Sequence, residues 1–135
     1  MRFLLGLDVG TTSTRTVIID ENSKPVASST SNYKLITPKP GWAEQIPDDW
    51  WIASIKTIKD VIKKSNISAE NIACVGLSGQ MYGSVFLDNG GNVIRPAILW
   101  CVQRTFKQCE TIYKIFGYYG FIKLSYNRAL PVNLM

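Results

Sequence analysis

The sequence predicts an α/β domain, because segments with strand-like and helix-like apolar patterns both occur within its 135 residues. Two apolar runs within residues 4–20 surround a loop of Gly, Thr and Ser, as expected for two strands joined as a hairpin. Segment 48–65 repeats apolar residues at helical spacing. Segment 72–78 is almost continuously apolar, which is typical of a strand buried on both faces of a sheet.

The overall composition limits the class of protein. A hydrophobic content of 46% and a charged content of 19% are those of a globular domain, and no apolar run approaches the roughly 20 residues of a membrane helix. The first strand begins almost at once, so we expect no signal peptide. The three cysteines, Cys74, Cys101 and Cys109, lack metal-ligand spacing and indicate reduced thiols in a cytoplasmic protein without membrane attachment. Without histidine, the usual Ser and Cys triads are excluded.

The net charge of +5 raises the question of nucleic-acid binding. The lysines are dispersed, and those at 56, 59, 63 and 64 share one helical segment, where they are typical of a solvated face. No Arg-rich patch alternates with aromatic residues, as single-strand binding requires. We therefore expect no nucleic-acid partner.

The segments between residues 20 and 66 continue the α/β pattern. After a polar turn, segment 25–33 is expected to form a third antiparallel strand, and segment 37–41 interrupts regular structure. Asp48 is a plausible helix N-cap, and the helix is expected to end at Ser65–Asn66. Its apolar stripe, which would pack on a sheet, consists of Trp51, Ile55, Ile58 and Ile62.

The second half of the chain has weaker signals. Residues 89–92, Asn-Gly-Gly-Asn, predict a hairpin turn between short strands at 84–88 and 93–95. Residues 97–100 form another short apolar run, and 103–116 predict a second amphipathic helix with Gly117 as its C-cap. Segment 118–135 contains no further core-forming period.

The loop after Asp8 suggests a specific chemistry. A loop of small residues at a strand end can direct several N–H groups and hydroxyls toward the oxygens of a polyphosphate. Asp8 would then hold hydrated Mg²⁺ against that phosphate, because Mg²⁺ takes oxygen ligands and retains water. The alternative is an ordinary hairpin in which Asp8 only forms the turn. Neither of the common glycine-rich nucleotide motifs occurs in the chain.

Asp8-Val9-Gly10-Thr11-Thr12-Ser13 resembles the first phosphate loop of the actin, Hsp70 and sugar-kinase superfamily, whose fold is ribonuclease H-like. Four further groups of residues follow in order: Gly41-Trp42-Ala43-Glu44-Gln45 with Asp49-Trp50-Trp51, Gly76-Leu77-Ser78-Gly79-Gln80-Met81, Arg95-Pro96-Ala97-Ile98-Leu99-Trp100, and Gln103-Arg104-Thr105. Together they resemble the FGGY carbohydrate kinases, and within them the xylulokinases, from residue 3 to about residue 131.

The resemblance implies a two-domain enzyme in which sugar binds mainly to the first domain and ATP lies between the domains. The residues facing the transferred phosphate would be Asp8, Gly10, Thr11, Thr12 and Ser13, with Asp8 also the Mg²⁺ residue. The residues lining the sugar pocket would be Gln80, Met81, Tyr82 and Trp100. For Met81 and Trp100, plain core packing is the alternative.

The chain also departs from the family pattern. Xylulokinases usually have His in place of Tyr82 and Asn-Asp in place of Cys101-Val102, so polar groups are missing from the expected sugar side. Restoring all three is expected to improve sugar binding, with each regained hydrogen bond contributing on the order of 1 kcal/mol. The resemblance further implies a general-base aspartate and an adenosine pocket that lie beyond these residues.

We therefore expect residues 1–131 to be part of an FGGY kinase N-terminal domain and residues 132–135 to be a truncated tail. The family reaction would transfer the γ-phosphate of MgATP to a hydroxyl of a ketopentose, and the isolated chain is expected to be inactive. Glu44 is the one carboxylate of the chain that merits testing as a base. The alternatives are a noncatalytic sugar- or phosphate-binding domain, completed by a separate partner chain, and a non-functional remnant.

Overall fold

The computed structural model describes residues 2–102 and 104–131, which divide into two compact units. Unit 1 is formed by the residues up to Lys34 together with Pro47–Gln80. Unit 2 is formed by Leu35–Ile46 together with the residues from Met81 onward. The expected truncated tail, 132–135, and Gln103 of the last motif lie outside the described residues.

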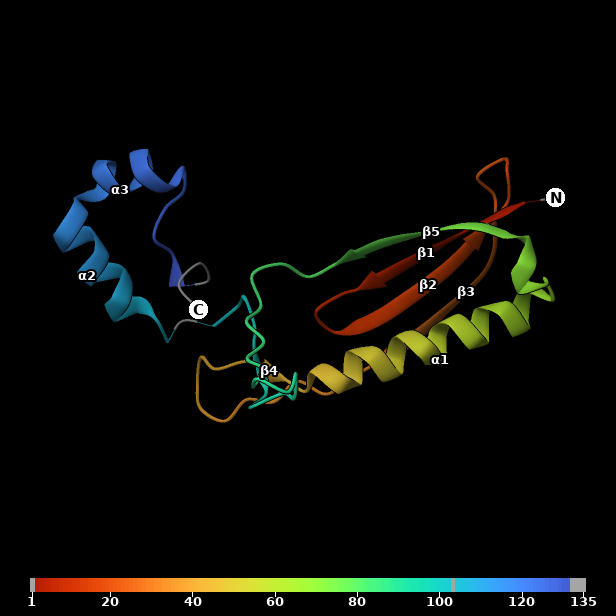
Figure 1. The fold of residues 1–135 in the computed structure, drawn as a ribbon, viewed down its shortest axis with the longest axis horizontal. Coiled ribbons are helices and arrows are strands. Elements are labelled where there is room, and N and C mark those ends of the chain that lie inside the picture. The colour runs from red at the N-terminus through yellow and green to blue at the C-terminus, as the bar shows by residue number, and fades with distance from the viewer. Residues whose placement is uncertain (1, 103, 132–135) are drawn as a thin grey trace. The chain divides into compact units, whose positions relative to one another are not determined.

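Unit 1 is built on a four-stranded mixed sheet with the strand order β3-β2-β1-β5 (Figure 1). Its strands are β1 (Phe3–Val9), β2 (Ser13–Ile19), β3 (Pro25–Asn32) and β5 (Ile72–Gly79). The first three form the antiparallel meander that the sequence predicts, and β5 joins β1 in parallel. The α/β class is therefore confirmed.

Helix α1 (Pro47–Ser65) runs along one face of this sheet and packs mainly over β2 and β3 (Figure 1). It begins with proline, which suits the first helical position, so the start lies one residue before the expected N-cap. Asp48 and Asp49 then occupy the first turn, where the helix dipole favours negative charge. The helix ends where predicted, and Asn66 has a left-handed φ of 54°.

The core of unit 1 lies between α1 and the sheet. Leu5, Ile18 and Val61 are buried at its centre, and Ile58 and Ile62 pack against them. Among these apolar residues, the Thr16 hydroxyl donates a 2.7 Å hydrogen bond to the Thr57 hydroxyl. The predicted apolar stripe of α1 is half-buried in its second half, at Ile58 and Ile62. Its first half is open, with Trp51 69% and Ile55 37% exposed.

The prediction that segment 72–78 is buried on both faces is wrong. Residues 73–79 are all exposed, because β5 is an edge strand paired only with β1 and lies away from the strands that α1 covers. The sequence pattern reports that the strand is apolar. It does not report whether the neighbours that would bury the strand are present. A short 3-10 turn, Ala69–Asn71, leads into β5.

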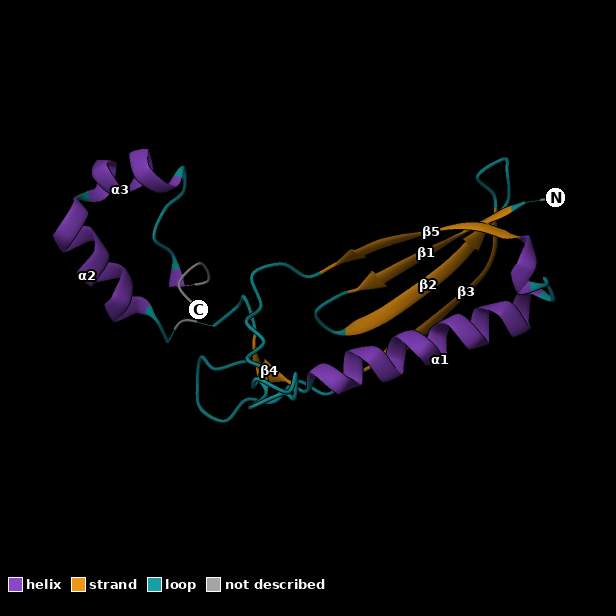
Figure 2. Ribbon diagram, in the orientation of Figure 1, coloured by secondary structure: helices purple, strands orange, loops and turns teal. Residues whose placement is uncertain are grey.

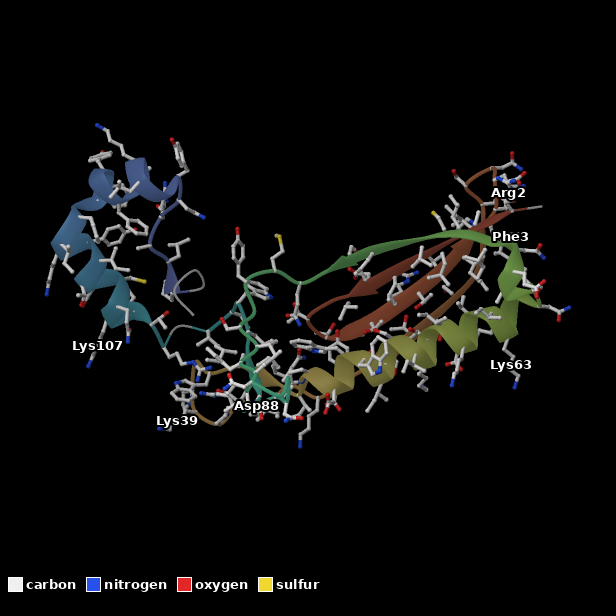
Figure 3. The ribbon with its side chains drawn as sticks, in the orientation of Figure 1. Arg2, Phe3, Lys39, Lys63, Asp88 and Lys107 are labelled. Atoms are coloured by element: carbon white, nitrogen blue, oxygen red, sulfur yellow. The ribbon has the colours of Figure 1, made fainter. Side chains whose placement is uncertain are left out.

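The first half of unit 2 contains much less regular secondary structure than unit 1 (Figure 2). Strand β4 (Glu44–Gln45) pairs antiparallel with β6 (Ala97–Ile98). The predicted strands at 84–88 and 93–95 are present only as isolated bridges, Ser84 with Ile98 and Leu87 with Val93. The predicted hairpin turn is confirmed: the Asp88 carboxylate, labelled in Figure 3, accepts backbone hydrogen bonds from Gly90 and Asn92.

Two helices complete the described part of unit 2. Helix α2 (Phe106–Phe116) confirms the second predicted helix, although it starts three residues later. Gly117, with φ of 69°, separates it from α3 (Tyr118–Ser125). Helix α3 was not predicted, but none of its residues is buried, in keeping with the expectation of no core-forming period in this segment; Phe121 contacts the rings of Tyr113 and Phe116.

Candidate functional site

Asp8 lies at the end of β1 between two polar side chains from neighbouring strands. The strand register places it opposite Arg15 of β2 and Ser78 of β5. The Ser78 hydroxyl donates a 2.7 Å hydrogen bond to Asp8 Oδ1. All three residues are exposed and line one open concavity of about 380 Å³. An aspartate, an arginine and a serine thus share one sheet surface. Sequence reasoning did not identify Arg15 or Ser78 as part of this group, although cross-strand register would have found Arg15.

The loop that follows Asp8 is closed on itself and anchored from β3. The Gly10 N–H donates to the Ser13 carbonyl over 3.0 Å. A Cβ at Gly10 would lie 3.3 Å from that carbonyl and 3.5 Å from Asp8 Oδ2, so glycine lets the carboxylate and the loop approach closely. The loop residues Thr11, Thr12 and Ser13 range from half-buried to exposed.

Tyr33 holds this loop and was not identified from the sequence. Its hydroxyl donates to the Gly10 carbonyl, and its N–H donates to the Thr12 carbonyl over 3.3 Å. Burial raises the pKa of the Tyr33 phenol, the nearby Thr14 hydroxyl lowers it, and the Asp8 carboxylate raises it. With its pKa raised overall, Tyr33 remains a neutral donor at physiological pH.

The ends of β1 and β5 meet at the same edge of the sheet. The Gln80 N–H donates to the Val9 carbonyl over 2.9 Å. A Cβ at Gly79 would lie only 2.9 Å from that carbonyl, so only glycine permits this approach without movement of the backbone. Gln80, expected on the sugar side, therefore lies at the strand edge from which the Asp8 loop also leaves, as ligand-binding residues do in open α/β sheets.

The other expected sugar-pocket residues belong to unit 2 and are exposed: Met81 by 69%, Tyr82 by 56% and Trp100 by 45%. The alternative that Met81 and Trp100 are core residues is therefore wrong for this structure. Ser84 and Ile98 exchange backbone hydrogen bonds, which holds the segments containing Tyr82 and Trp100 side by side. Grouping these three residues with Gln80 in one pocket stays a prediction, since they lie in different units.

Tyr82 has an unusual backbone conformation. Its φ of 57° lies in the left-handed region, which a bulky side chain rarely adopts. Such conformations cost on the order of 1 kcal/mol or more and concentrate at ligand sites. Tyr126, which is not among the expected site residues, has nearly the same φ of 56°, so this conformation alone assigns no role to Tyr82.

Glu44 is held in a buried ionic cluster and does not act as a base in this structure. Its side chain is 5% exposed, and Oε1 accepts hydrogen bonds from Arg104 Nη1 at 2.8 Å and from Arg95 Nη2. The Arg104 guanidinium in turn stacks on Trp42, 4.2 Å from the ring centroid. Because Arg95 precedes β6 and Arg104 follows it, the Glu44 carboxylate links β4 to the segments on both sides of β6. The suggestion that it could be tested as a base is thus not supported.

The sequence-based expectation that position 102 lies on the sugar side is wrong. Its side chain is 1% exposed, and its N–H donates to the Leu99 carbonyl over 3.2 Å. Replacing it with Asp would bury a carboxylate, which destabilises a protein unless the charge is paired there. Cys101, by contrast, is exposed. The expected gain in sugar binding can therefore apply only to Tyr82→His and Cys101→Asn.

The Asp8 region suits Mg²⁺ but not a metal held entirely by protein. Among the described residues, no group of three or more Cys, Asp or Glu side chains could hold a metal ion. Mg²⁺ commonly uses one or two carboxylates and takes its remaining oxygens from water and phosphate. The exposed Asp8 carboxylate beside the loop fits that requirement.

In the same described residues, no helix is both long and apolar enough to cross a membrane.

The sheet order and the loop at its edge are those of the ribonuclease H-like fold shared by actin, Hsp70 and sugar kinases. Solved structures agree: this chain superposes with a TM-score of 0.87 on gluconate kinase from Lactobacillus acidophilus, at 27% identity over 97% of this chain and 26% of that one. For xylulose kinase from Rhodospirillum rubrum, the TM-score is 0.81 at 26% identity, covering 90% of this chain and 25% of that one.

Sequence comparison gives the family. The model for the N-terminal domain of the FGGY family of carbohydrate kinases matches residues 3–125. Xylulose kinase from Bacillus subtilis is 36% identical over 130 residues, which is 96% of this chain and 26% of that protein. Glycerol kinase from Caldanaerobacter subterraneus is 38% identical over 112 residues, 82% of this chain and 22% of that protein. This chain belongs to the FGGY family of carbohydrate kinases, and it spans about a quarter of the length of these relatives.

Proposed function

We propose that this chain supplies the phosphate loop and part of the sugar site of a xylulokinase-like enzyme. The reaction would transfer the γ-phosphate of MgATP to a hydroxyl of a ketopentose. The observation that carries the proposal is the exposed Asp8 carboxylate, braced by Ser78 and adjoining the loop of Gly10 to Ser13. Family membership supports the same conclusion.

On the phosphate side, Asp8 would hold Mg²⁺, and the loop residues Gly10, Thr11, Thr12 and Ser13 would hydrogen-bond the phosphate oxygens. Bound Mg²⁺ supplies positive charge that offsets the charge of the transferring phosphate. Arg15, in register with Asp8, adds a fixed cation to the same surface. Tyr33 keeps the loop in place by bonding the carbonyls of Gly10 and Thr12.

On the sugar side, Gln80 would hydrogen-bond a hydroxyl and Trp100 would pack against the sugar carbons. Tyr82 would offer its phenol in place of the more common imidazole, and Met81 would add apolar contact. The exposure of Met81, Tyr82 and Trp100 leaves their side chains accessible to a ligand, as this role requires.

We propose that the isolated chain binds its ligands but does not catalyse phosphoryl transfer to a sugar. A missing general base typically costs 10²–10⁴-fold in rate. Two carboxylates at strand ends are engaged in turns: Asp20 accepts the N–H groups of Asn22 and Lys24, and Asp88 accepts those of Gly90 and Asn92. Glu44 is occupied by two arginines. Phosphoryl transfer depends chiefly on positioning, which one open loop does not supply.

The remainder of the kinase would come from further polypeptide, either continuous with this chain or from a separate partner chain. Without that remainder, the chain would serve as a noncatalytic sugar- or phosphate-binding domain. We place the protein in the cytoplasm, where ATP is available and where the thiols of Cys74, Cys101 and Cys109, all unpaired, would stay reduced.

The test is an NMR titration of the ¹⁵N-labelled chain with MgATP. We expect shifts concentrated in the amides of residues 10–13, and at least about tenfold weaker binding in Asp8→Ala, since charge-assisted contacts contribute about 1.5–3 kcal/mol. Asp49→Ala, which removes a carboxylate from the first turn of α1, is the matched control. Unchanged binding by Asp8→Ala would refute the phosphate site. Ketose-dependent ADP release that disappears in Asp8→Ala would refute the proposed lack of turnover.

A further inference from the structure

The ionic cluster around Glu44 carries more positive than negative charge. Arg95 and Arg104 both donate to the same oxygen, Glu44 Oε1, and the Glu44 side chain is 5% exposed. The Lys39 ammonium, labelled in Figure 3, lies 5.2 Å from the centroid of the Trp42 ring on which Arg104 also stacks. One buried carboxylate thus faces two guanidinium groups, with a third cation close by. Buried charge of one sign is costly unless an opposite charge compensates it.

One edge of the Arg104 guanidinium has no acceptor. Its Nη1 bonds to Glu44, whereas its Nε and Nη2 are buried and donate to no atom of the described residues. The Nε–H group and one Nη2–H group point in parallel, and such a fork matches two oxygens of a carboxylate or phosphate. Arg95 Nε is likewise buried and unpartnered within the described part of the chain. The unpartnered edge of Arg104 is therefore a complete two-point donor site.

This fork is held in a fixed orientation. The Arg104 Cζ atom lies 4.2 Å from the centroid of the Trp42 ring, so stacking sets the plane of the guanidinium. The bond to Glu44 then sets its rotation within that plane. Because the Arg104 side chain is only 12% exposed, most of its rotamer freedom is already lost on folding. A ligand that binds the fork loses little further conformational entropy from the protein.

We propose that the fork of Arg104, with Arg95 Nε beside it, binds one small oxyanion, a carboxylate or a phosphate group. Both guanidinium groups bond to the same Glu44 oxygen, so their unpartnered nitrogens lie in one neighbourhood. An oxyanion there supplies the missing acceptors and offsets the excess positive charge. Arg95 connects the site to solvent, since its side chain is 40% exposed.

A buried water molecule is the competing occupant. Water accepts hydrogen bonds but carries no charge, so it would leave two guanidinium groups facing one carboxylate. It also has one oxygen, whereas the fork matches two. The oxyanion site is independent of the proposed phosphoryl transfer, because the cluster belongs to unit 2 and the Asp8 loop belongs to unit 1. Its failure would leave the Asp8 site standing.

The experiment is an NMR titration of the ¹⁵N-labelled full chain with sodium phosphate and, separately, sodium acetate, with sodium chloride holding the ionic strength constant. We expect one of the two oxyanions to shift the Arg104 Nε–H signal and the amides of residues 42–44, with saturation below about 10 mM. Phosphate and acetate represent the two chemical sources, and the one that shifts these signals identifies the ligand class. In Asp8→Ala the same shifts should persist.

Arg104→Lys keeps the charge but removes the fork, so it should weaken binding at the amides of residues 42–44 at least about tenfold. Arg95→Lys should weaken the same binding at least about threefold, and it provides a second test if Arg104→Lys unfolds unit 2, since the Arg95 side chain is more exposed. Arg128→Lys, the same change at an exposed arginine, is the matched control and should leave binding unchanged.

An Arg104 signal that neither oxyanion shifts would leave water as the occupant and overturn the proposal. Equal shifts on addition of sodium chloride alone would also overturn it, because they would show screening of the charge and not a site. So would oxyanion binding that is as strong in folded Arg104→Lys or Arg95→Lys as in Arg128→Lys. Shifts confined to residues 10–13 would place the ion at the Asp8 loop and likewise overturn the proposal.

Discussion

The two units hold their parts of the candidate site in different ways. Unit 1 positions Asp8 through the backbone ladders of a four-stranded sheet, where register with β2 and β5 sets its neighbours. In the described part of unit 2, a two-residue ladder and isolated bridges pair the strands, and the buried Glu44 carboxylate links further segments. The first arrangement distributes its stability over many backbone hydrogen bonds. The second combines a few backbone hydrogen bonds with one buried ionic side chain, so a single substitution at that side chain should separate the two units.

The largest expected effect is that of Glu44→Gln on unit 2. The change leaves the guanidinium groups of Arg95 and Arg104 facing a neutral amide, and breaking a buried ion pair typically costs about 3–5 kcal/mol. Hydrogen-exchange mass spectrometry should show faster exchange at residues 97–99 while the amides of Ile18 and Val61 in unit 1 keep their protection.

Glu110→Gln, which neutralises an exposed carboxylate on α2, is the control and should leave both regions unchanged. If Glu44→Gln accelerates hydrogen exchange equally in both units, the Glu44 ion pairs stabilise unit 1 as well. That result would contradict the inferred difference between the two units.

The next effect concerns the contact between β5 and β1. Gly79→Ala places a Cβ 2.9 Å from the Val9 carbonyl and should destabilise unit 1 by about 1–3 kcal/mol through overpacking. Gly76→Ala is the matched variant on the same strand. A Cβ there meets nothing within 4 Å, so it should be neutral or slightly stabilising. Thermal unfolding followed by circular dichroism tests the pair, and equal Tm values for both variants would contradict the close approach.

The hydroxyl pair between the sheet and α1 should respond asymmetrically. Thr57→Val leaves the buried Thr16 hydroxyl without its acceptor, which should cost about 1–3 kcal/mol. Thr16→Val should cost less, because the Thr57 hydroxyl still donates to the Ser54 carbonyl over 3.1 Å. Urea unfolding of both single variants and the double variant measures the coupling. A larger loss for Thr16→Val would reverse the inferred direction of the hydrogen bond.

The smallest effect is the pH dependence contributed by Tyr33. Folding raises its pKa above the ordinary value of 10.0, so its stabilising contribution is complete below about pH 10 and declines as pH rises through the folded value. The Tm difference between the wild type and Tyr33→Phe should be constant from pH 7 to about 9.5 and shrink at higher pH. A difference that grows with alkaline pH would show that the phenol does not act as a neutral donor to the loop.

The fold of unit 1 was largely predictable because its signals are local. The meander, the Asp8 loop and α1 follow from apolar periodicity and turn residues within short windows. The exposure of Val75 and Leu77 was not, because an apolar strand looks the same whether or not its neighbours are present.

In the candidate site, the sequence indicated Asp8 and its loop but missed Arg15, Tyr33 and Ser78. These side chains reach the loop only through the sheet register or through the end of β3. The burial of Glu44 and Val102 likewise could not be predicted from the sequence. The first is paired with Arg104, 60 residues away along the chain, and nothing local marks the second as a core residue.

The bond between Ser78 and Asp8 joins residues 70 positions apart in the chain, and this separation orders the folding of the site. The meander of β1 to β3 needs only short loop closures, whereas β5 must close a much longer one and therefore joins later. During synthesis, Asp8 and its loop emerge well before Ser78. In pulse-labelled refolding, we expect the amides of the β1–β2 hairpin to be protected from exchange early and those of β5 only afterwards. A phosphate ligand that requires the hydrogen bond between Ser78 and Asp8 would therefore bind only after β5 has joined the sheet.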